Sequence, residues 1–464
     1  MDWNHVPANL QEARQHLPDL IRQVERRAPY AHALISRNSG LQITVTDREQ
    51  QVKEMEPSSG LVLSAWNGAY FDELATSDLS KASLDTLTRD LSSGLNVRSP
   101  VGLDPGPALD QHWSTAMQHD PTNLSVKDKL ALCLDLHRRT RGLDPHIVNV
   151  QVRYQERCES KAFANRSRHL SQNVLRLRLF VLVVVTDGAR IQYDWVDKDG
   201  TGGLEVVSIS DQELHDLCTK AVASLAADKI PPGVYQVVTC PDVSGVIAHE
   251  AFGHGVELDM FLKDRARSRE YLNRAVASPL VSILDDPSYP GGHGTYFFDD
   301  EGQIASPTCI IRDGVFRQGL SDLFTSHRLG MPHTANGRRE SFERKNYVRM
   351  SNTFFARGTT PVAELFSGID YGIYLNKTSS GMEDPKGWGM QVTSQCGEEI
   401  RQGKLTGRLF APIGITGYVP DILQSVSAVG NDFRLTGGTC GKGHKEWVPV
   451  SSGGPHLLLK ARLG

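Results

Sequence analysis

The apolar residues near the start of the chain recur every three to four positions and then give way to short β-prone runs. Within Asn9–Arg27 they are Leu10, Leu17, Leu20, Ile21 and Val24. This spacing predicts an amphipathic helix, because residues three or four apart share one helix face. The following Ala31–Thr46 predicts two short strands around an Asn-Ser-Gly turn, as in a hairpin, and Gly60–Trp66 predicts another strand that ends at Asn-Gly.

A helical period returns further along the first half and alternates with longer apolar runs. The predicted elements are helices at Ser80–Ser93, Ser125–Arg141 and Asp211–Ala227 and strands at Val148–Tyr154 and Val174–Val185. Ser125 is a residue type that favours an N-cap. The last helix is followed by Lys-Ile-Pro-Pro-Gly at 229–233. Paired prolines and a glycine cannot continue a helix, so we predict a domain boundary after residue 230.

Short strands bounded by glycine predominate in the second half. They are predicted at Gly233–Val238, Pro307–Ile311, Gly372–Leu375, Gly389–Val392 and Leu405–Leu409. Such repetition indicates a β-dominated domain with a few helices. We therefore predict an α+β fold of two domains, with an N-terminal mixed α/β domain at 1–230 and a C-terminal β-rich domain at 231–464.

Composition excludes several classes of protein. With 464 residues, 39% hydrophobic and 22% charged, the chain can bury a sizeable core and is not a disordered protein. Its net charge of −4 gives no electrostatic reason to expect a nucleic-acid or membrane partner. The longest apolar run, Leu177–Val185, is about half of the ~20 residues that cross a bilayer, and no apolar leader is visible at the N-terminus. Seven cysteines without a CxxC pair do not form a disulfide framework, and we expect a cytoplasmic protein.

One segment combines the residue types of a metal site. His249-Glu250-x-x-x-His254 places two imidazoles around a carboxylate, in a run predicted to be helical from an N-cap at Asp242 or Ser244. Residues five apart on a regular helix point about 140° apart, so the two rings meet only if the helix widens or ends between them. Gly253 is placed to allow that change. The pattern favours a metal over two unrelated core histidines.

A catalytic zinc requires three protein ligands and an open position, so two histidines are one ligand short. Glu257 is the nearest carboxylate in the sequence. Cys440 is the rival, because a thiolate is a strong zinc ligand and the glycines around it let a loop approach a crowded site. The residues alone leave both alternatives open.

Five motifs, in order, resemble the TldD/PmbA family of peptidases. The motifs are HEAFGHGVE at 249–257, DDEG at 299–302, NGRRES at 336–341 with RMSNT at 349–353, VGND at 429–432, and CGK at 440–442 before Pro449-Val450. The resemblance implies a zinc ion held by His249, His254 and Cys440, with Glu250 as the catalytic carboxylate and Glu257 supporting a ligand. It also implies the metal-bearing TldD-like branch of the family, which acts on unfolded peptides. The active assembly would be a homodimer or a heterodimer with a metal-free paralogue.

The expected chemistry is hydrolysis by a metal-activated water, with Glu250 taking the proton of the water and passing it to the departing nitrogen. Arg338, Arg339 and Arg349 are candidates for binding the substrate, with structural ion pairs as the alternative for each. Two rival functions remain: a non-catalytic binding or regulatory subunit with a structural metal, and a zinc hydrolase of a non-peptide amide. The chain departs from the family pattern at 379–385 and at 443–447.

Overall fold

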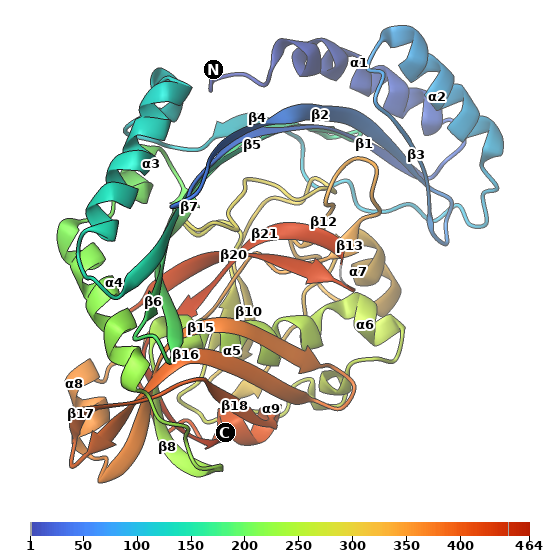
Figure 1. Ribbon diagram of the computed structural model, residues 1–464. Helices are drawn as coiled ribbons and strands as arrows, with labels where there is room; N and C mark the ends of the chain where they lie inside the picture. Colours follow the sequence, from blue (N-terminus) through green and yellow to red (C-terminus); the bar gives the residue numbers. More distant parts are fainter. Residues whose placement is uncertain (1, 444) are drawn as a thin grey trace.

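The computed structural model describes residues 2–443 and 445–464. His444, within the departure predicted at 443–447, lies outside the described residues. A long curved sheet built from the first half arches over a more compact second half (Figure 1). Helices and strands are mixed in the first half and strands predominate in the second, which confirms the predicted α+β class with a β-rich C-terminal domain. No helix among the described residues is long and apolar enough to span a bilayer.

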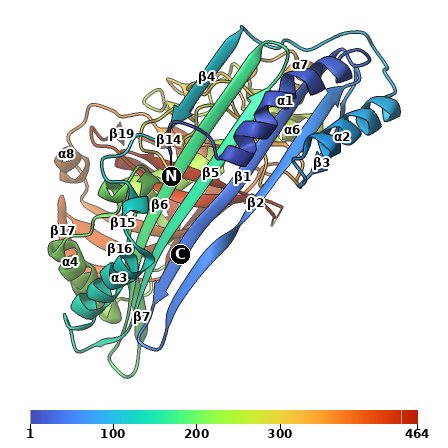
Figure 2. The same ribbon diagram turned by 90° about the horizontal axis from the view of Figure 1, so that it is seen from above.

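The N-terminal sheet is antiparallel except where β4 pairs with β6, and its strands run in the order β3-β2-β1-β5-β6-β4, with β7 also on β6. The strands are β1 (Tyr30–Val45), β2 (Gln50–Trp66), β3 (Phe71–Thr76), β4 (Leu109–Ser114), β5 (Ile147–Ala164), β6 (Arg168–Thr186) and β7 (Ile191–Thr201). Helices α1 (Ala8–Val24) and α2 (Lys81–Gly94) lie on the face turned away from the second half (Figure 2). Helices α3 (Val126–Arg141) and α4 (Asp211–Ala223) pack against the other end of the sheet.

The helix predictions for this half are confirmed, and the hairpin prediction is wrong. Ser125 caps α3 in a reciprocal pair of hydrogen bonds with Asp128. The segment predicted as a hairpin is the single strand β1. It pairs with β2 on one side and β5 on the other, and these pairings keep the Asn-Ser-Gly stretch extended. The stretch causes only a shift of register in the pairing with β2, between Asn38 and Gly40.

The C-terminal half contains two larger sheets and a short pair. The first sheet runs β11-β10-β9-β14-β21-β20, and the second closes a ring of pairings, β15-β8-β22-β18-β16-β15, with β17 on β16 and β19 on β22. The strands are β8 (Gly233–Thr239), β9 (Ile283–Asp285), β10 (Thr308–Arg312), β11 (Val315–Phe316), β12 (Gly337–Arg338), β13 (Tyr347–Val348), β14 (Asn352–Phe355), β15 (Tyr371–Asp384), β16 (Gly389–Arg401), β17 (Lys404–Phe410), β18 (Ile413–Tyr418), β19 (Ala428–Val429), β20 (Arg434–Lys442), β21 (Lys445–Gly454) and β22 (Leu457–Leu463).

Helix α5 (Pro241–Phe252) is buried between these two sheets, and the smaller helices are α6 (Leu258–Leu262), α7 (Leu323–Leu329), α8 (Val362–Ser367) and α9 (Val419–Gln424). The packing of α5 on β21 leaves no room for a side chain at Gly245. A Cβ atom there would lie 2.3 Å from the backbone nitrogen of Gly453 and 2.5 Å from its Cα. Backbone cannot give way as a flexible side chain does, so a glycine at this position sets how deeply α5 sits.

Gly245→Ala is therefore expected to destabilise the protein by about 1–3 kcal/mol, the usual cost of overpacking a core. Urea unfolding followed by circular dichroism measures the change. Gly389→Ala is the matched control, because nothing lies within 4 Å of its Cβ position, and its stability should stay close to that of the wild type. Equal midpoints for the two variants would contradict this view of the packing.

Candidate metal centre

The helix that carries the motif ends between its two histidines. Helix α5 stops at Phe252, Gly253 is its C-cap, and a 3₁₀ turn follows at His254–Val256. The rings of His249 and His254 consequently lie 5.1 Å apart, nearly perpendicular to one another. Glycine is required at 253, because a Cβ atom would lie 2.2 Å from the backbone oxygen of His249 and 1.9 Å from the Met350 sulfur. The break predicted at Gly253 is confirmed.

The start of the same helix differs from the prediction. Neither Asp242 nor Ser244 is the N-cap, because α5 already begins at Pro241, after Cys240. The carboxylate of Asp242 accepts hydrogen bonds from the backbone nitrogen and the hydroxyl of Thr378 instead. Proline suits the first position of a helix, where no internal partner exists for its nitrogen, and this favours the earlier start.

Strand β20 brings Cys440 to the two histidines. Its Sγ lies 3.2 Å from Nε2 of His254, and one ligand atom from each of His249, His254 and Cys440 falls within 4.8 Å of the others. His249 and Cys440 are buried, with exposed fractions of 8% and 6%. The structure thus joins the three residues that the family resemblance implies as ligands.

Electrostatics favours a thiolate at this position. Burial opposes ionisation of the Cys440 thiol, but the attraction of His254 and His249 outweighs it and holds the pKa of Cys440 well below its usual range. Burial likewise disfavours the charged form of His254, but Cys440 and Glu257 raise the pKa of that ring well above its usual value. A thiolate beside two imidazoles is a donor set typical of zinc.

Glu257 lies behind His254, outside this group of three. One oxygen of its carboxylate is 3.4 Å from Nδ1 of His254 and accepts a hydrogen bond of 3.0 Å from Nζ of Lys442. Burial would raise the pKa of Glu257, but Lys442 and His254 lower it to about 2, so the carboxylate stays charged. This arrangement orients the His254 ring, as carboxylates behind metal-binding histidines commonly do.

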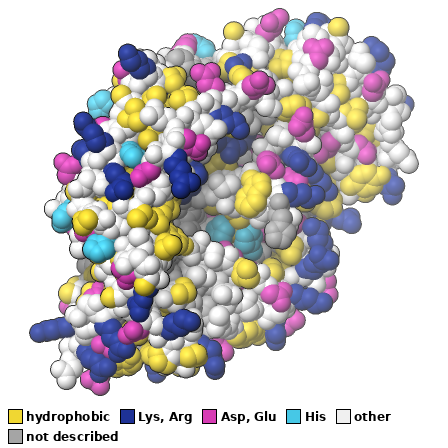
Figure 3. Space-filling view, viewed as in Figure 1, with side chains coloured by type: hydrophobic (Ala, Val, Ile, Leu, Met, Phe, Trp, Pro, Cys, Tyr) yellow, Lys and Arg dark blue, Asp and Glu magenta, His cyan; other side chains and the backbone are white. Residues whose placement is uncertain are grey.

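Glu250 and His249 line a cavity of about 700 Å³ between the two halves of the molecule. Figure 3 shows this side as a hollow in which histidine side chains are visible. Trp195 of β7 and Lys220 of α4 line the cavity from the N-terminal half, and residues of β15 and β20 line it from the C-terminal half. A carboxylate at the wall of a large cavity next to potential metal ligands is suited to act on a bound molecule.

Comparison with known proteins assigns the family. Residues 232–462 match the PmbA/TldA metallopeptidase C-terminal domain. A metalloprotease from Methanothermobacter thermautotrophicus is 30% identical over 455 residues, which cover 96% of this chain and 97% of that protein. The chain belongs to the PmbA/TldD family. The resemblance carried by the five motifs is therefore confirmed.

Two further proteins are similar to this chain. A zinc metalloprotease TldD homolog from Saccharolobus solfataricus is 27% identical, over 70% of this chain and 74% of that protein. The crystal structure of TldE from Thermococcus kodakarensis superposes with a TM-score of 0.75 at 14% identity, over 96% of this chain and 99% of that one. The latter likeness concerns the fold.

The three arginines of the PmbA/TldD motifs bind other parts of the protein. Arg338 donates to the backbone carbonyl of Met350 at 2.6 Å, and Arg339 forms an ion pair with Glu73 of the N-terminal sheet. Arg349, 1% exposed, donates to the carbonyls of Cys440 and Glu446. None of the three lines the cavity beside Glu250. Of the two alternatives for these residues, the structure favours the structural one.

Glu383 of β15 was missed in the sequence. The residue is half-buried, and both of its carboxylate oxygens are buried without a hydrogen-bond partner among the described residues. One of them lies 2.7 Å from where a Cβ of Gly255 would be. Burial raises the pKa of Glu383 well above its usual value, and the charge of His254 opposes that rise. The only signal in the sequence is that Glu383 falls in the departure from the PmbA/TldD pattern at 379–385.

We predict that Cys440→Ala protein, purified after growth with zinc, contains less than about a tenth of the wild-type metal bound at this site, because removing one of three ligands leaves no stable site. Glu257→Gln should retain metal but bind it about 10–100-fold more weakly, since only the orientation of His254 is disturbed. Elemental analysis and chelator competition measure the two effects. Cys309→Ala is the control and should retain the metal. If Cys440→Ala kept all of its metal and Glu257→Gln lost it, the third ligand would be Glu257 and not Cys440.

Proposed function

We propose that this chain is a zinc-dependent peptidase that hydrolyses peptide bonds of unfolded or extended polypeptides, with Glu250 as general base. The observation that supports it best is the convergence of His249, His254 and Cys440, the first of which lines the same cavity as Glu250. Three protein ligands leave a fourth position open, which is typical of catalytic zinc, whereas structural zinc usually has four.

The residues fit a zinc ion in a second respect. Nδ1 of His249 is buried without a hydrogen-bond partner among the described residues, as expected of a ring whose partner is not a protein atom. Next to it, the lowered pKa of Cys440 supplies the thiolate that a metal needs. The relative from Saccharolobus solfataricus, named a zinc metalloprotease, supports the same choice of ion.

Zinc bound here would act as a Lewis acid that lowers the pKa of an attacking water toward about 7. Glu250 takes a proton from that water during attack on the peptide carbonyl and returns it to the leaving nitrogen, so that the amine departs neutral. Glu257, held by Lys442, keeps His254 in the orientation that faces Cys440.

The strands around the cavity support an extended polypeptide as substrate. β20 is the last strand of its sheet, so one edge of it has no strand partner in the described parts of the chain. Residues 436–439 of that strand and 377–381 of β15 line the cavity on either side of Glu250. A peptide that adds to such an edge is bound through its backbone, and only an unfolded segment has its backbone free. Selection would therefore depend on foldedness more than on side chains.

Glu250→Gln is expected to retain zinc and to lose cleavage of an unfolded polypeptide by about 10²–10⁴-fold, because the amide cannot accept the proton. Fragments are quantified by mass spectrometry and zinc by elemental analysis. Glu364→Gln, which changes an exposed carboxylate on α8, is the control and should cleave as the wild type does.

Cleavage by Glu250→Gln at the wild-type rate, with zinc bound, would contradict the role of the base. Zinc binding without cleavage of any polypeptide by the wild type would favour the rival of a binding or regulatory subunit. Cleavage of small amides while unfolded polypeptides remain intact would favour the rival of a non-peptide hydrolase.

Binding through the backbone predicts sensitivity to backbone methylation. A good peptide substrate N-methylated two or three residues from the cleaved bond should lose kcat/KM by at least ~10-fold, because a methylated nitrogen cannot donate to the strand edge. Side-chain substitutions at the same positions serve as controls and should have smaller effects. Larger effects from the side chains than from methylation would contradict recognition by strand pairing.

A further inference from the structure

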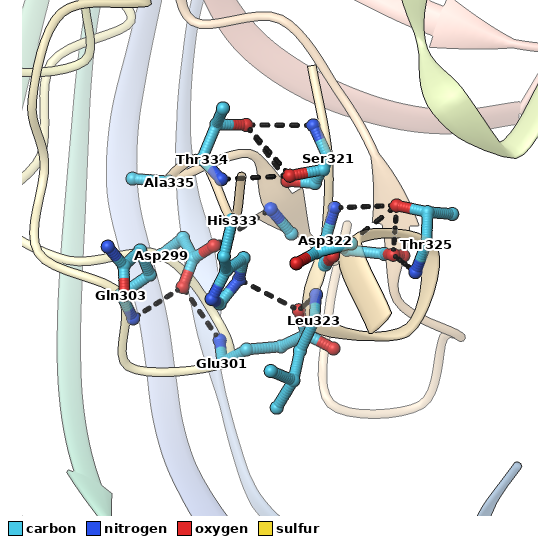
Figure 4. Close-up of polar contacts among 12 residues, drawn as sticks. Asp299, Glu301, Gln303, Ser321, Asp322, Leu323, Thr325, His333, Thr334 and Ala335 are labelled. Carbon is cyan, nitrogen blue, oxygen red and sulfur yellow. Dashed lines mark hydrogen bonds and ion pairs between the residues drawn. The ribbon is translucent and has the colours of Figure 1, made fainter. Parts of the chain in front are cut away.

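A second cluster of metal-binding residue types lies apart from the centre described above. Asp299 and Glu301 belong to the turn that follows Phe298, and His333 precedes β12. One ligand atom from each of the three falls within 4.8 Å of the others. Figure 4 shows the ring of His333 beside the two acidic residues, with the start of α7 next to them.

Both carboxylates are fixed in place by backbone hydrogen bonds. Asp299 accepts from the backbone nitrogens of Glu301, Gln303 and Gly337 at 2.9–3.0 Å. Glu301 accepts from the backbone nitrogen of Leu323, the first residue of α7, at 2.6 Å. Because these hydrogen bonds already fix both carboxylates, binding of a ligand would cost little side-chain conformational entropy.

No lysine or arginine among the described residues forms an ion pair with the two buried carboxylates of this cluster. Asp299 and Glu301 are 2% and 6% exposed, and the buried carboxylate of Asp322, which caps α7, lies close enough to raise the pKa of Glu301 further. Two guanidiniums lie nearby: Arg339 is already paired with Glu73, and Arg168 donates to the carbonyl of Gly302.

Buried polar atoms of two side chains around the carboxylates lack hydrogen-bond partners among the described residues. Nε2 of His333 has no hydrogen bond among the described residues and faces the carboxylate of Glu301 at 3.8 Å. Asn346 is 9% exposed, and neither atom of its amide is bonded. A Cβ on Gly337 would lie 2.6 Å from the Glu301 carboxylate and 2.9 Å from the Asn346 amide nitrogen, so both groups point over the same glycine. Polar atoms without hydrogen-bond partners, next to buried carboxylates that no described lysine or arginine pairs with, indicate a ligand with positive charge.

We propose that Asp299, Glu301 and His333 hold a divalent transition-metal ion in a site separate from the His249–His254–Cys440 centre. One imidazole with two carboxylates suits Zn²⁺ or Mn²⁺, whereas Ca²⁺ and Mg²⁺ prefer oxygen ligands throughout. Two positive charges on the ion balance the two carboxylates. His333 has 20% of its side chain exposed and provides the edge through which an ion enters.

The ion has a structural role. The turn that supplies Asp299 and Glu301 is also where the second half meets the N-terminal sheet, since Arg168 donates to the carbonyl of Gly302 at 2.6 Å and Lys161 pairs with Asp300 at 2.6 Å. A metal that ties this turn to residue 333 therefore stabilises the contact between the two halves.

The test uses the full-length chain with the first centre removed, as the His249→Ala/Cys440→Ala double variant. After loading with excess Zn²⁺ or Mn²⁺ and desalting, this protein should retain about one ion per chain by elemental analysis, and the wild type loaded with Zn²⁺ about two. Adding Glu301→Gln should reduce retention in the double variant at least tenfold. Glu343→Gln, an exposed carboxylate beyond the NGRRES segment, is the matched control and should change nothing.

Thermal unfolding supplies a second readout, because a chelator should lower the melting temperature of the double variant but not of the form with Glu301→Gln. Should Glu301→Gln fail to fold, His333→Gln takes its place, since that side chain lies at the exposed edge. No ion retained by the double variant, or equal retention with and without Glu301, overturns the proposal. The outcome is independent of peptidase activity, because the first centre is absent from the proteins compared.

Discussion

The centre of this protein depends on how closely one buried helix approaches the strands beside it. At Gly245 the backbone of α5 rests against the backbone of β21, and at Gly253 the helix ends against the sulfur of Met350. The first contact sets the depth of the helix, and the second requires glycine at the break after which His254 lies near His249. Only with both in place does β20, the neighbour of β21, bring Cys440 within 3.2 Å of His254.

Charged residues behind the ligands hold this arrangement without entering it. Lys442 bridges the carboxylates of Glu257 and Asp259, and Arg349 donates to the carbonyl of Cys440. These cations compensate buried carboxylates that would otherwise be costly, and they also fix the orientation of His254 and the path of β20. Arginines that looked in the sequence like candidates for contacting a substrate therefore serve the framework.

The sequence predicted those features of the fold that depend on residues close to one another along the chain. The cap of α3, the break at Gly253 and the predominance of strands after residue 233 follow from residue types and spacing alone. The single strand β1 does not, because two neighbouring strands override the turn preference of Asn-Ser-Gly. The surroundings of Glu383 could not be predicted for a related reason, and the same holds for the cluster of Asp299, Glu301 and His333. Both depend on segments that lie far apart in the sequence and are brought together by the fold, and residue spacing does not indicate such contacts.

The seam between the two halves is lined with buried charge. Lys161 pairs with Asp300, Arg339 with Glu73, and Arg176, which is 1% exposed, donates to the carbonyls of His293 and Thr295. Pulling the halves apart would strand these groups, since each partner lies on the other half. We therefore expect the two halves to unfold together. An isolated C-terminal fragment would keep His249, His254 and Cys440 but would lack the basic residues that pair across this contact and the cavity wall formed by β7 and α4.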